Sequence, residues 1–372
     1  MRAAAAALCI LGCAKSGAHP TPTTDGALAV ANLSAQIAGQ EQSLQRAPRS
    51  IEAMAALIEL LQTRVQYTGS VSDFRRIAAL GEQAVAVSVS DEALLARASS
   101  SAALHRFAAA LRDLDRMRDG EAALPLRASI LQARGDLQGA VALRRSAVAR
   151  YASTRTLGSL AAAEGAAGDA GSAARDFAAA EAAYRDSSPF PLAWTDLQRG
   201  LLAERRGELA AAERSYSAAL ARLPQYAQAR GHLAGVLALE GRPVEAEDLL
   251  QPLAASDDPE YEGQLSRIAR DPARRAALRE HAARRYDALL AEFPEAFADH
   301  AARFFLDRDP ARALSLARMN LAARPTAEAF DLALSAAVLA GATDCSLARD
   351  ALSQPSAPAR FRMLAGRICL RR

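Results

Sequence analysis

Four glycines recur through the middle of this chain at nearly constant spacing. Gly135, Gly168, Gly207 and Gly241 are separated by 33, 39 and 34 residues. Glycine lets a chain reverse between two antiparallel helices, because its backbone enters the left-handed region without steric cost. The spacing therefore predicts a series of helical hairpins.

An alanine follows each of these glycines by five residues, where it keeps the second helix of the hairpin thin enough for close packing. The one long step, of 39 residues, contains the insertion 187–191, which is rich in serine and proline. Weaker copies extend the pattern in both directions. The predicted series is Ala110, Ala140, Ala173, Ala212, Ala246, Ala282 and Ala313.

The clearest unit, residues 195–224, resembles the tetratricopeptide repeat (TPR), whose period is about 34 residues. The resemblance implies an all-α fold, a TPR-type superhelical solenoid of antiparallel helix hairpins with a concave groove. An irregular, alanine-rich helical bundle is the alternative, and the fixed places of glycine, tyrosine and proline argue against it. The matching residues are Gly200, Gly207, Ala212, Tyr216, Ala219 and Pro224.

The first residues resemble the signal of a bacterial lipoprotein. A positive start and a short apolar run lead to Ile10-Leu11-Gly12-Cys13, so 1–12 is the expected signal peptide and Cys13 the expected lipidation site. Leu11 stands where alanine or serine is commoner, and an ordinary secretory signal is the alternative. Ala14 in place of aspartate favours the outer membrane, facing the periplasm.

Residues 13–27 are the expected flexible tether, 28–260 the TPR-like repeats, and 261–372 further degenerate TPR-like repeats with a C-terminal cap. The expected mature chain keeps two cysteines, Cys345 and Cys369. An even pair in an oxidising compartment predicts one disulfide. Two separate thiols are the alternative.

The composition favours a protein partner over nucleic acid. The chain has 51% hydrophobic residues and a formal net charge of +3, and its basic residues are interspersed with acidic ones. No two of the five histidines have a metal-ligand spacing, and no phosphate-binding or serine-hydrolase motif is present. We expect no enzyme, no metal and no cofactor.

The TPR resemblance assigns groove positions within the first helix of each hairpin. The residues around them are small, which suits an apolar helix or extended peptide, with Trp194 as an aromatic anchor. Packing of Trp194 into the core beneath the proline-rich insertion is the alternative. The candidate binding residues are Trp194, Leu197, Leu201, Glu204, Arg205 and Gln228.

The expected function is a non-enzymatic scaffold of the bacterial cell envelope, which serves as an assembly or secretion adaptor. One alternative is an accessory subunit of an envelope enzyme complex, which predicts polar residues converging in the groove. Another is a cytoplasmic TPR scaffold whose N-terminus only mimics a signal.

Overall fold

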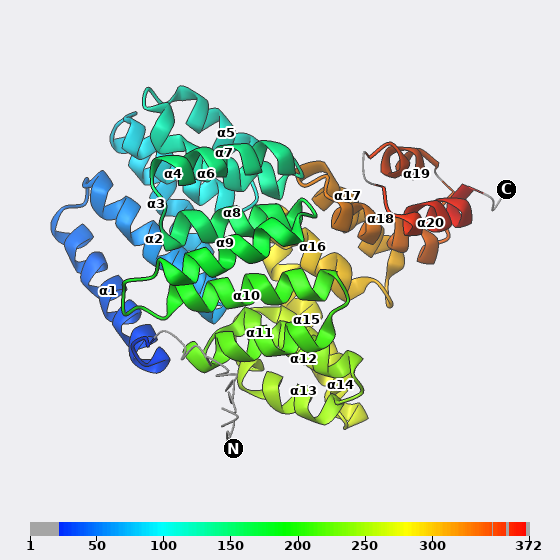
Figure 1. Ribbon diagram of the computed structural model, residues 1–372. Coiled ribbons are helices and arrows are strands. Elements are labelled where there is room, and N and C mark those ends of the chain that lie inside the picture. Colours follow the sequence, from blue (N-terminus) through cyan, green and yellow to red (C-terminus); the bar gives the residue numbers. More distant parts are fainter. Residues whose placement is uncertain (1–21, 344, 355–356, 370–372) are drawn as a thin grey trace, which may run out of the picture.

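Helices make up the regular structure of the described residues, which are 22–343, 345–354 and 357–369 in a computed structural model (Figure 1). The expected signal peptide and Cys13 lie outside them. None of the described helices is both long and apolar enough to cross a membrane. The helices are α1 (Gly26–Arg46), α2 (Ile51–Thr68), α3 (Asp73–Val87), α4 (Asp91–Ala103), α5 (Phe107–Arg116), α6 (Gly120–Ala133), α7 (Leu137–Arg150), α8 (Thr154–Ala166), α9 (Ala170–Ala182), α10 (Phe190–Arg205), α11 (Leu209–Arg222), α12 (Ala227–Leu239), α13 (Pro243–Leu250), α14 (Pro259–Ile268), α15 (Pro272–Glu292), α16 (Pro294–Phe305), α17 (Pro310–Ala323), α18 (Ala327–Leu339), α19 (Cys345–Leu352) and α20 (Ala359–Cys369).

Consecutive helices from α2 onward pair into hairpins that stack in chain order. The first helices touch one another along the stack: α2 contacts α4, α8 contacts α10, and α12, α14 and α16 follow in sequence. Figure 1 shows this stacking from α4–α7 through α8–α11 to α12–α13. The all-α, TPR-type solenoid expected from the sequence is confirmed.

The turn inside each hairpin follows the predicted chemistry. Gly207 has φ of 72°, in the left-handed region, and Gly135, Gly168 and Gly241 adopt the same conformation. In two of these turns an aspartate caps the N-terminus of the next helix. The side chains of Asp136 and Asp169 each accept a hydrogen bond at 2.9 Å from an amide of the following helix.

The predicted alanine series lies at the closest contacts between helices. All seven alanines, from Ala110 to Ala313, have exposed fractions of 0%. In the best unit a Cβ atom at Gly200 would overlap the ring of Tyr216, which is itself fully buried. Small residues therefore decide how closely the two helices approach.

The first described helix begins inside the expected tether. Helix α1 starts at Gly26, inside the segment 13–27 that the sequence assigned to a tether, and Gly26 packs against Leu223 and Pro224. The amide of Thr24 also donates to the carbonyl of Ser187 at 2.7 Å. The C-terminal end of the expected tether is thus part of the fold, because the α11–α12 loop and the insertion supply partners for it.

The stack winds far enough for its first hairpins to meet its last ones. A Cβ atom at Gly69 would lie 3.3 Å from the Tyr261 ring, and one at Gly135 would lie 3.0 Å from the carbonyl of Pro325. His105 Nδ1 lies 3.2 Å from the carbonyl oxygen of Glu295. These pairs are 192, 190 and 190 residues apart. Other contacts between the same turns have different separations, such as Tyr67 with Phe190, which are 123 residues apart.

Aromatic rings fill this contact between turns, which we call the inter-turn contact. The Tyr67 ring centroid lies 4.7 Å from those of both Phe190 and Tyr226. Farther along, Phe74 meets Phe293 and Phe297. Two apolar clusters, one around Tyr67 and one around Phe293, therefore hold the first turn to the second.

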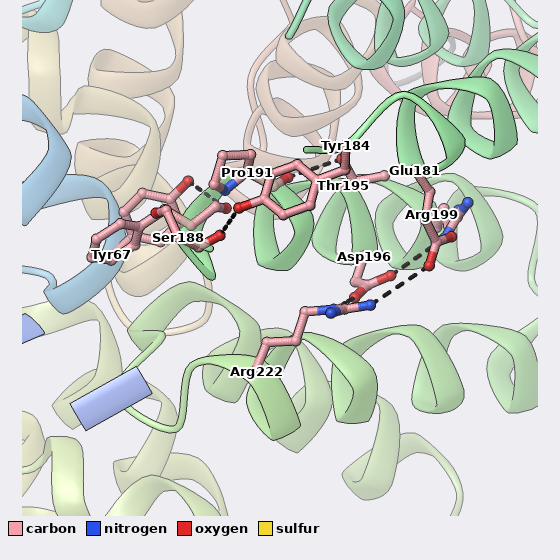
Figure 2. Close-up of polar contacts among 10 residues, drawn as sticks. Tyr67, Glu181, Tyr184, Ser188, Pro191, Thr195, Asp196, Arg199 and Arg222 are labelled. Carbon is pink, nitrogen blue, oxygen red and sulfur yellow. Dashed lines mark hydrogen bonds and ion pairs between the residues drawn. The ribbon is translucent and has the colours of Figure 1, made fainter. Parts of the chain in front are cut away.

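The insertion before α10 is fixed in this contact (Figure 2). Tyr67 donates to the carbonyl of Phe190 at 2.9 Å, and Tyr184 donates to the carbonyl of Ser188. On α10, Asp196 binds both Arg222 of α11 and Arg199, at 3.0 and 3.4 Å (Figure 2). The extra residues therefore join the two turns rather than form a free loop.

A disulfide joins Cys345 at the start of α19 to Cys369 at the end of α20, with 5.5 Å between the Cα atoms. It closes the hairpin formed by α19 and α20, the last of the described helices.

Candidate functional site

The candidate residues of the sequence lie on the face formed by the first helices of the hairpins, here called the first-helix face. Trp194 is half-buried and lies over Gly158 of α8, where a Cβ atom would come within 3.3 Å of the indole. It also packs against the buried clusters around Phe177 and Leu197. Trp194 thus supports the α8–α10 packing while keeping part of its surface accessible.

Leu197 does not belong to a binding surface, contrary to the sequence prediction. Its exposed fraction is 1%, and it lies in the core between α10 and α11. Leu201 is half-buried against the same cluster, whereas Arg205 and Gln228 are exposed. Spacing within the repeat predicts a groove position for Leu197, but the tight packing of α10 on α11 around Gly200 turns its side chain inward.

Glu204 is the candidate with the most defined geometry. It accepts a hydrogen bond from the hydroxyl of Tyr216 at 2.5 Å, and His232 Nδ1 on the next first helix lies 3.0 Å from Glu204 Oε2. Burial alone would raise the pKa of Glu204, but the hydrogen bond and charge of His232 outweigh it and lower that pKa. Glu204 is thus held as a carboxylate.

The same pairing recurs two first helices along the stack. His300 Nδ1 on α16 lies 2.8 Å from Glu260 Oε2 on α14, and Asp299 lies 3.6 Å from the other ring nitrogen. The charge of Asp299, followed by that of Glu260, raises the pKa of His300 to about 10 despite its burial. His300 is therefore a cation at neutral pH.

These two pairs come from the successive first helices α10, α12, α14 and α16, and we call the four side chains the polar row: Glu204, His232, Glu260 and His300. Its two halves interact, since the charge of His232 helps to lower the pKa of Glu260. Gln264, beside Glu260, has a buried Oε1 atom without a hydrogen-bond partner among the described residues. The smooth, small-residue groove expected from the sequence is therefore wrong, and this stretch of the face is polar.

The polar row remains reachable from solvent. The side chains of Glu204, His232, Glu260 and His300 have exposed fractions of 35, 34, 33 and 38%. Each carboxylate keeps oxygen lone pairs beyond those used by its imidazole partner. The row can accept hydrogen bonds from a bound chain and present a fixed imidazolium to its carbonyls.

Sequence reasoning missed three of the four residues of the row. His232, Glu260 and His300 are widely separated in the sequence. A usable signal existed for one pair, because Glu204 and His232, 28 residues apart, lie on the first helices of consecutive predicted hairpins.

Metal chemistry finds no support in the part of the chain that is described. No group of three or more His, Cys, Asp or Glu side chains there is arranged to hold a metal ion. The row alternates acids with histidines that bond to them, so its donors are already engaged in pairs.

Comparison with known proteins gives one family match: residues 203–268 match the tetratricopeptide repeat family. These residues run from the end of α10 through α14 and include His232 and Glu260. A comparison with curated protein sequences finds no match.

Among solved structures, the chain is similar to one described as the APC/C hetero-tetramer Cut9-Hcn1, with a TM-score of 0.38 and 12% identity over 82% of this chain. Another is described as Naa15/Naa10 bound to HypK-THB, with a TM-score of 0.32 and 15% identity over 88% of this chain. This chain spans 52% and 61% of the lengths of those two chains.

The family match and the observed hairpins together define the class of protein: a TPR-type superhelical solenoid. Repeat arrays of this kind present extended surfaces to other proteins, so the repeats support a protein-interaction scaffold.

Proposed function

We propose that this protein is a non-enzymatic scaffold of the bacterial cell envelope, anchored by lipid on Cys13, that binds an extended segment of another protein along its first-helix face. The observation that carries the binding site is the polar row. Its four side chains come from alternate helices of one stack, and each is about one third exposed.

The chemistry of the row suits a peptide backbone. An extended chain offers amide donors and carbonyl acceptors at short intervals. Carboxylates such as Glu204 accept from the amides, and the protonated His300 donates to a carbonyl. Trp194 and Leu201, half-buried one to three turns before Glu204 on α10, add apolar contact for a side chain of the partner.

In-cell photocrosslinking would test the binding face. A photoreactive amino acid at Gln228, which is exposed one turn before His232, should capture a discrete partner. The matched control carries the same group at Tyr151, which is 73% exposed in the loop before α8. Glu204→Gln with His232→Gln should abolish the adduct at position 228, because both accepting and donating groups are changed. Identical adducts at 228 and 151, or none at 228, would contradict the proposed face.

The lipid anchor needs its own test, since it rests on the resemblance of residues 1–13 to a lipoprotein signal. Cells given radiolabelled palmitate should label the protein, and Cys13→Ser should remove the label and release the protein from membranes. A soluble, unlabelled protein would instead favour the cytoplasmic scaffold.

The polar row also keeps one other candidate, an accessory subunit of an envelope enzyme complex, because that function predicts converging polar residues. Experiments on the purified partner, once crosslinking has captured it, distinguish the scaffold from the accessory subunit. If the partner is an enzyme whose kcat falls with the Glu204→Gln and His232→Gln variant while its binding is unchanged, the accessory role is supported; loss of binding alone supports the scaffold.

A further inference from the structure

Four arginines gather where α14, α15 and α16 meet, without carboxylate partners. We call Arg267, Arg275, Arg279 and Arg303 the arginine cluster. Within the part of the chain that the structure describes, none of the four forms an ion pair. Arg267 and Arg303 are exposed, and Arg275 and Arg279 are half-buried.

Main-chain contacts bring the side chain of Arg267 to α16 and that of Arg279 to the end of α14. Arg267 donates to the carbonyl of Arg303 at 2.9 Å, and Arg279 donates to the carbonyl of Ser266 at 3.4 Å. Arg275 precedes Arg279 by one turn on the same side of α15. The carbonyls lie near the ends of α14 and α16, where a positive charge is favourable.

The nearby carboxylates are already occupied by other cations. Glu247 binds Arg270 and Arg274 together, at 3.1 and 2.9 Å. Glu262 is likewise shared by His281 and Arg285. Asp299 lies within reach of the charge of Arg303, but His300 and Arg324 share it. The arginine cluster therefore has no carboxylate of its own among the ion pairs of the described residues.

The arginine cluster keeps many hydrogen-bond donors unused. Each guanidinium has five N–H donors, and the contacts of Arg267 and Arg279 use one or two of them. A fold that needed only caps for the helix ends would need fewer charges here.

We propose that the arginine cluster binds an acidic segment, rich in aspartate and glutamate, of a partner protein. The guanidinium fork pairs with a carboxylate through two parallel hydrogen bonds, which a single ammonium group does not match. The four forks come from three helices, so they fit several carboxylates of one segment. On α14 and α16 the cluster lies one to two turns beyond Glu260 and His300 of the polar row. Recognition of an acidic segment there goes beyond the proposed function.

Fluorescence anisotropy of a labelled polyglutamate peptide, titrated with the full-length protein in mild detergent, would test the proposal. The variant Arg267→Gln, Arg279→Gln, Arg303→Gln should weaken binding by about tenfold or more, because it removes several charge-assisted hydrogen bonds. The matched control, Arg127→Gln, Arg206→Gln, Arg284→Gln, changes the net charge equally. Those arginines already pair with carboxylates on the surface, so the control should weaken binding by less than about threefold.

A single change guards against loss of folding. Arg275→Gln removes no hydrogen bond or ion pair that the structure records, so the variant should fold normally and still bind the peptide several-fold more weakly. Equal losses in the cluster variant and the control would overturn the proposal, since bulk charge would then explain binding. So would no binding by the unaltered protein, or tighter binding to anionic vesicles or DNA that depends on the same arginines.

Discussion

His300 on α16 lies 2.8 Å from Glu260 on α14 and 3.6 Å from the preceding Asp299, so one imidazole faces two carboxylates. This relationship predicts a specific pH dependence of stability. Both charges raise the pKa of His300 to about 10, against about 6.5 in an unfolded chain. A raised pKa means that the stabilisation is complete below pH 6.5 and is lost as pH rises toward 10.

We expect His300→Gln to remove about 1 kcal/mol of stability at pH 6 and almost none above pH 10, a modest value because solvent screens a side chain that is 38% exposed. Urea unfolding of both proteins across this pH range measures the difference. A difference between the two proteins that does not change with pH would mean that His300 is not held as a cation.

Packing around Gly200 gives a second prediction. Gly200→Ala should lower the free energy of unfolding by about 1–3 kcal/mol, because the added Cβ atom would overlap the ring of Tyr216. The matched control is Gly235→Ala. Gly235 lies at an exposed place in α12 where a Cβ atom would meet nothing within 4 Å, so alanine should stabilise the helix by up to about 1 kcal/mol. Urea unfolding compares the two variants. If both change the free energy of unfolding in the same direction and by a similar amount, the packing argument is refuted.

The repeat is the part of the fold that the sequence predicts well, because local chemistry sets it. A reversing glycine such as Gly207 and an alanine such as Ala212 recur in the four central hairpins, where the turn itself requires them. Within one hairpin, the partners of Tyr216 are also close in sequence. Spacing therefore carries most of the information about a single unit.

The inter-turn contact and the polar row were beyond sequence reasoning for a physical reason. Whether Gly135 meets Pro325 depends on a small rotation added at every hairpin, and the sum over many hairpins decides which residues meet. Glu260 and His300 are brought together by the packing of α14 on α16, which spacing alone does not encode. Leu197 was misplaced for the same reason, since its direction depends on how tightly α10 packs.

The disulfide between Cys345 and Cys369 leads to a third prediction. It closes a loop with a sequence separation of 24 residues, and restricting the unfolded chain in this way stabilises by about 3 kcal/mol. Reduction, or the double change Cys345→Ser and Cys369→Ser, should therefore speed amide hydrogen exchange in α19 and α20. Exchange in α8–α12 should not change, since α19 and α20 pack chiefly against each other and against α18. Uniform loosening of the whole chain would show that the C-terminal hairpin is coupled to all the others.

The fourth prediction concerns the winding of the stack itself. Tyr67 is buried between Phe190 and Tyr226, and its hydroxyl donates to the carbonyl of Phe190 at 2.9 Å. Tyr67→Ala should cost about 3–5 kcal/mol, as for other large buried aromatic side chains. Tyr67→Phe keeps the ring and loses only the hydrogen bond, so it should cost about 1 kcal/mol.

A change in the shape of the molecule, beyond the loss of stability, distinguishes the inter-turn contact from an ordinary core position. Because Tyr67 joins residues more than a hundred positions apart, Tyr67→Ala should separate the first hairpins from the last and increase the radius of gyration in small-angle X-ray scattering. The exposed Tyr151→Ala should leave both stability and radius unchanged. If Tyr67→Ala lowered stability while the radius stayed the same, the other aromatic contacts, such as Phe74 with Phe297, would be sufficient to hold the turns together.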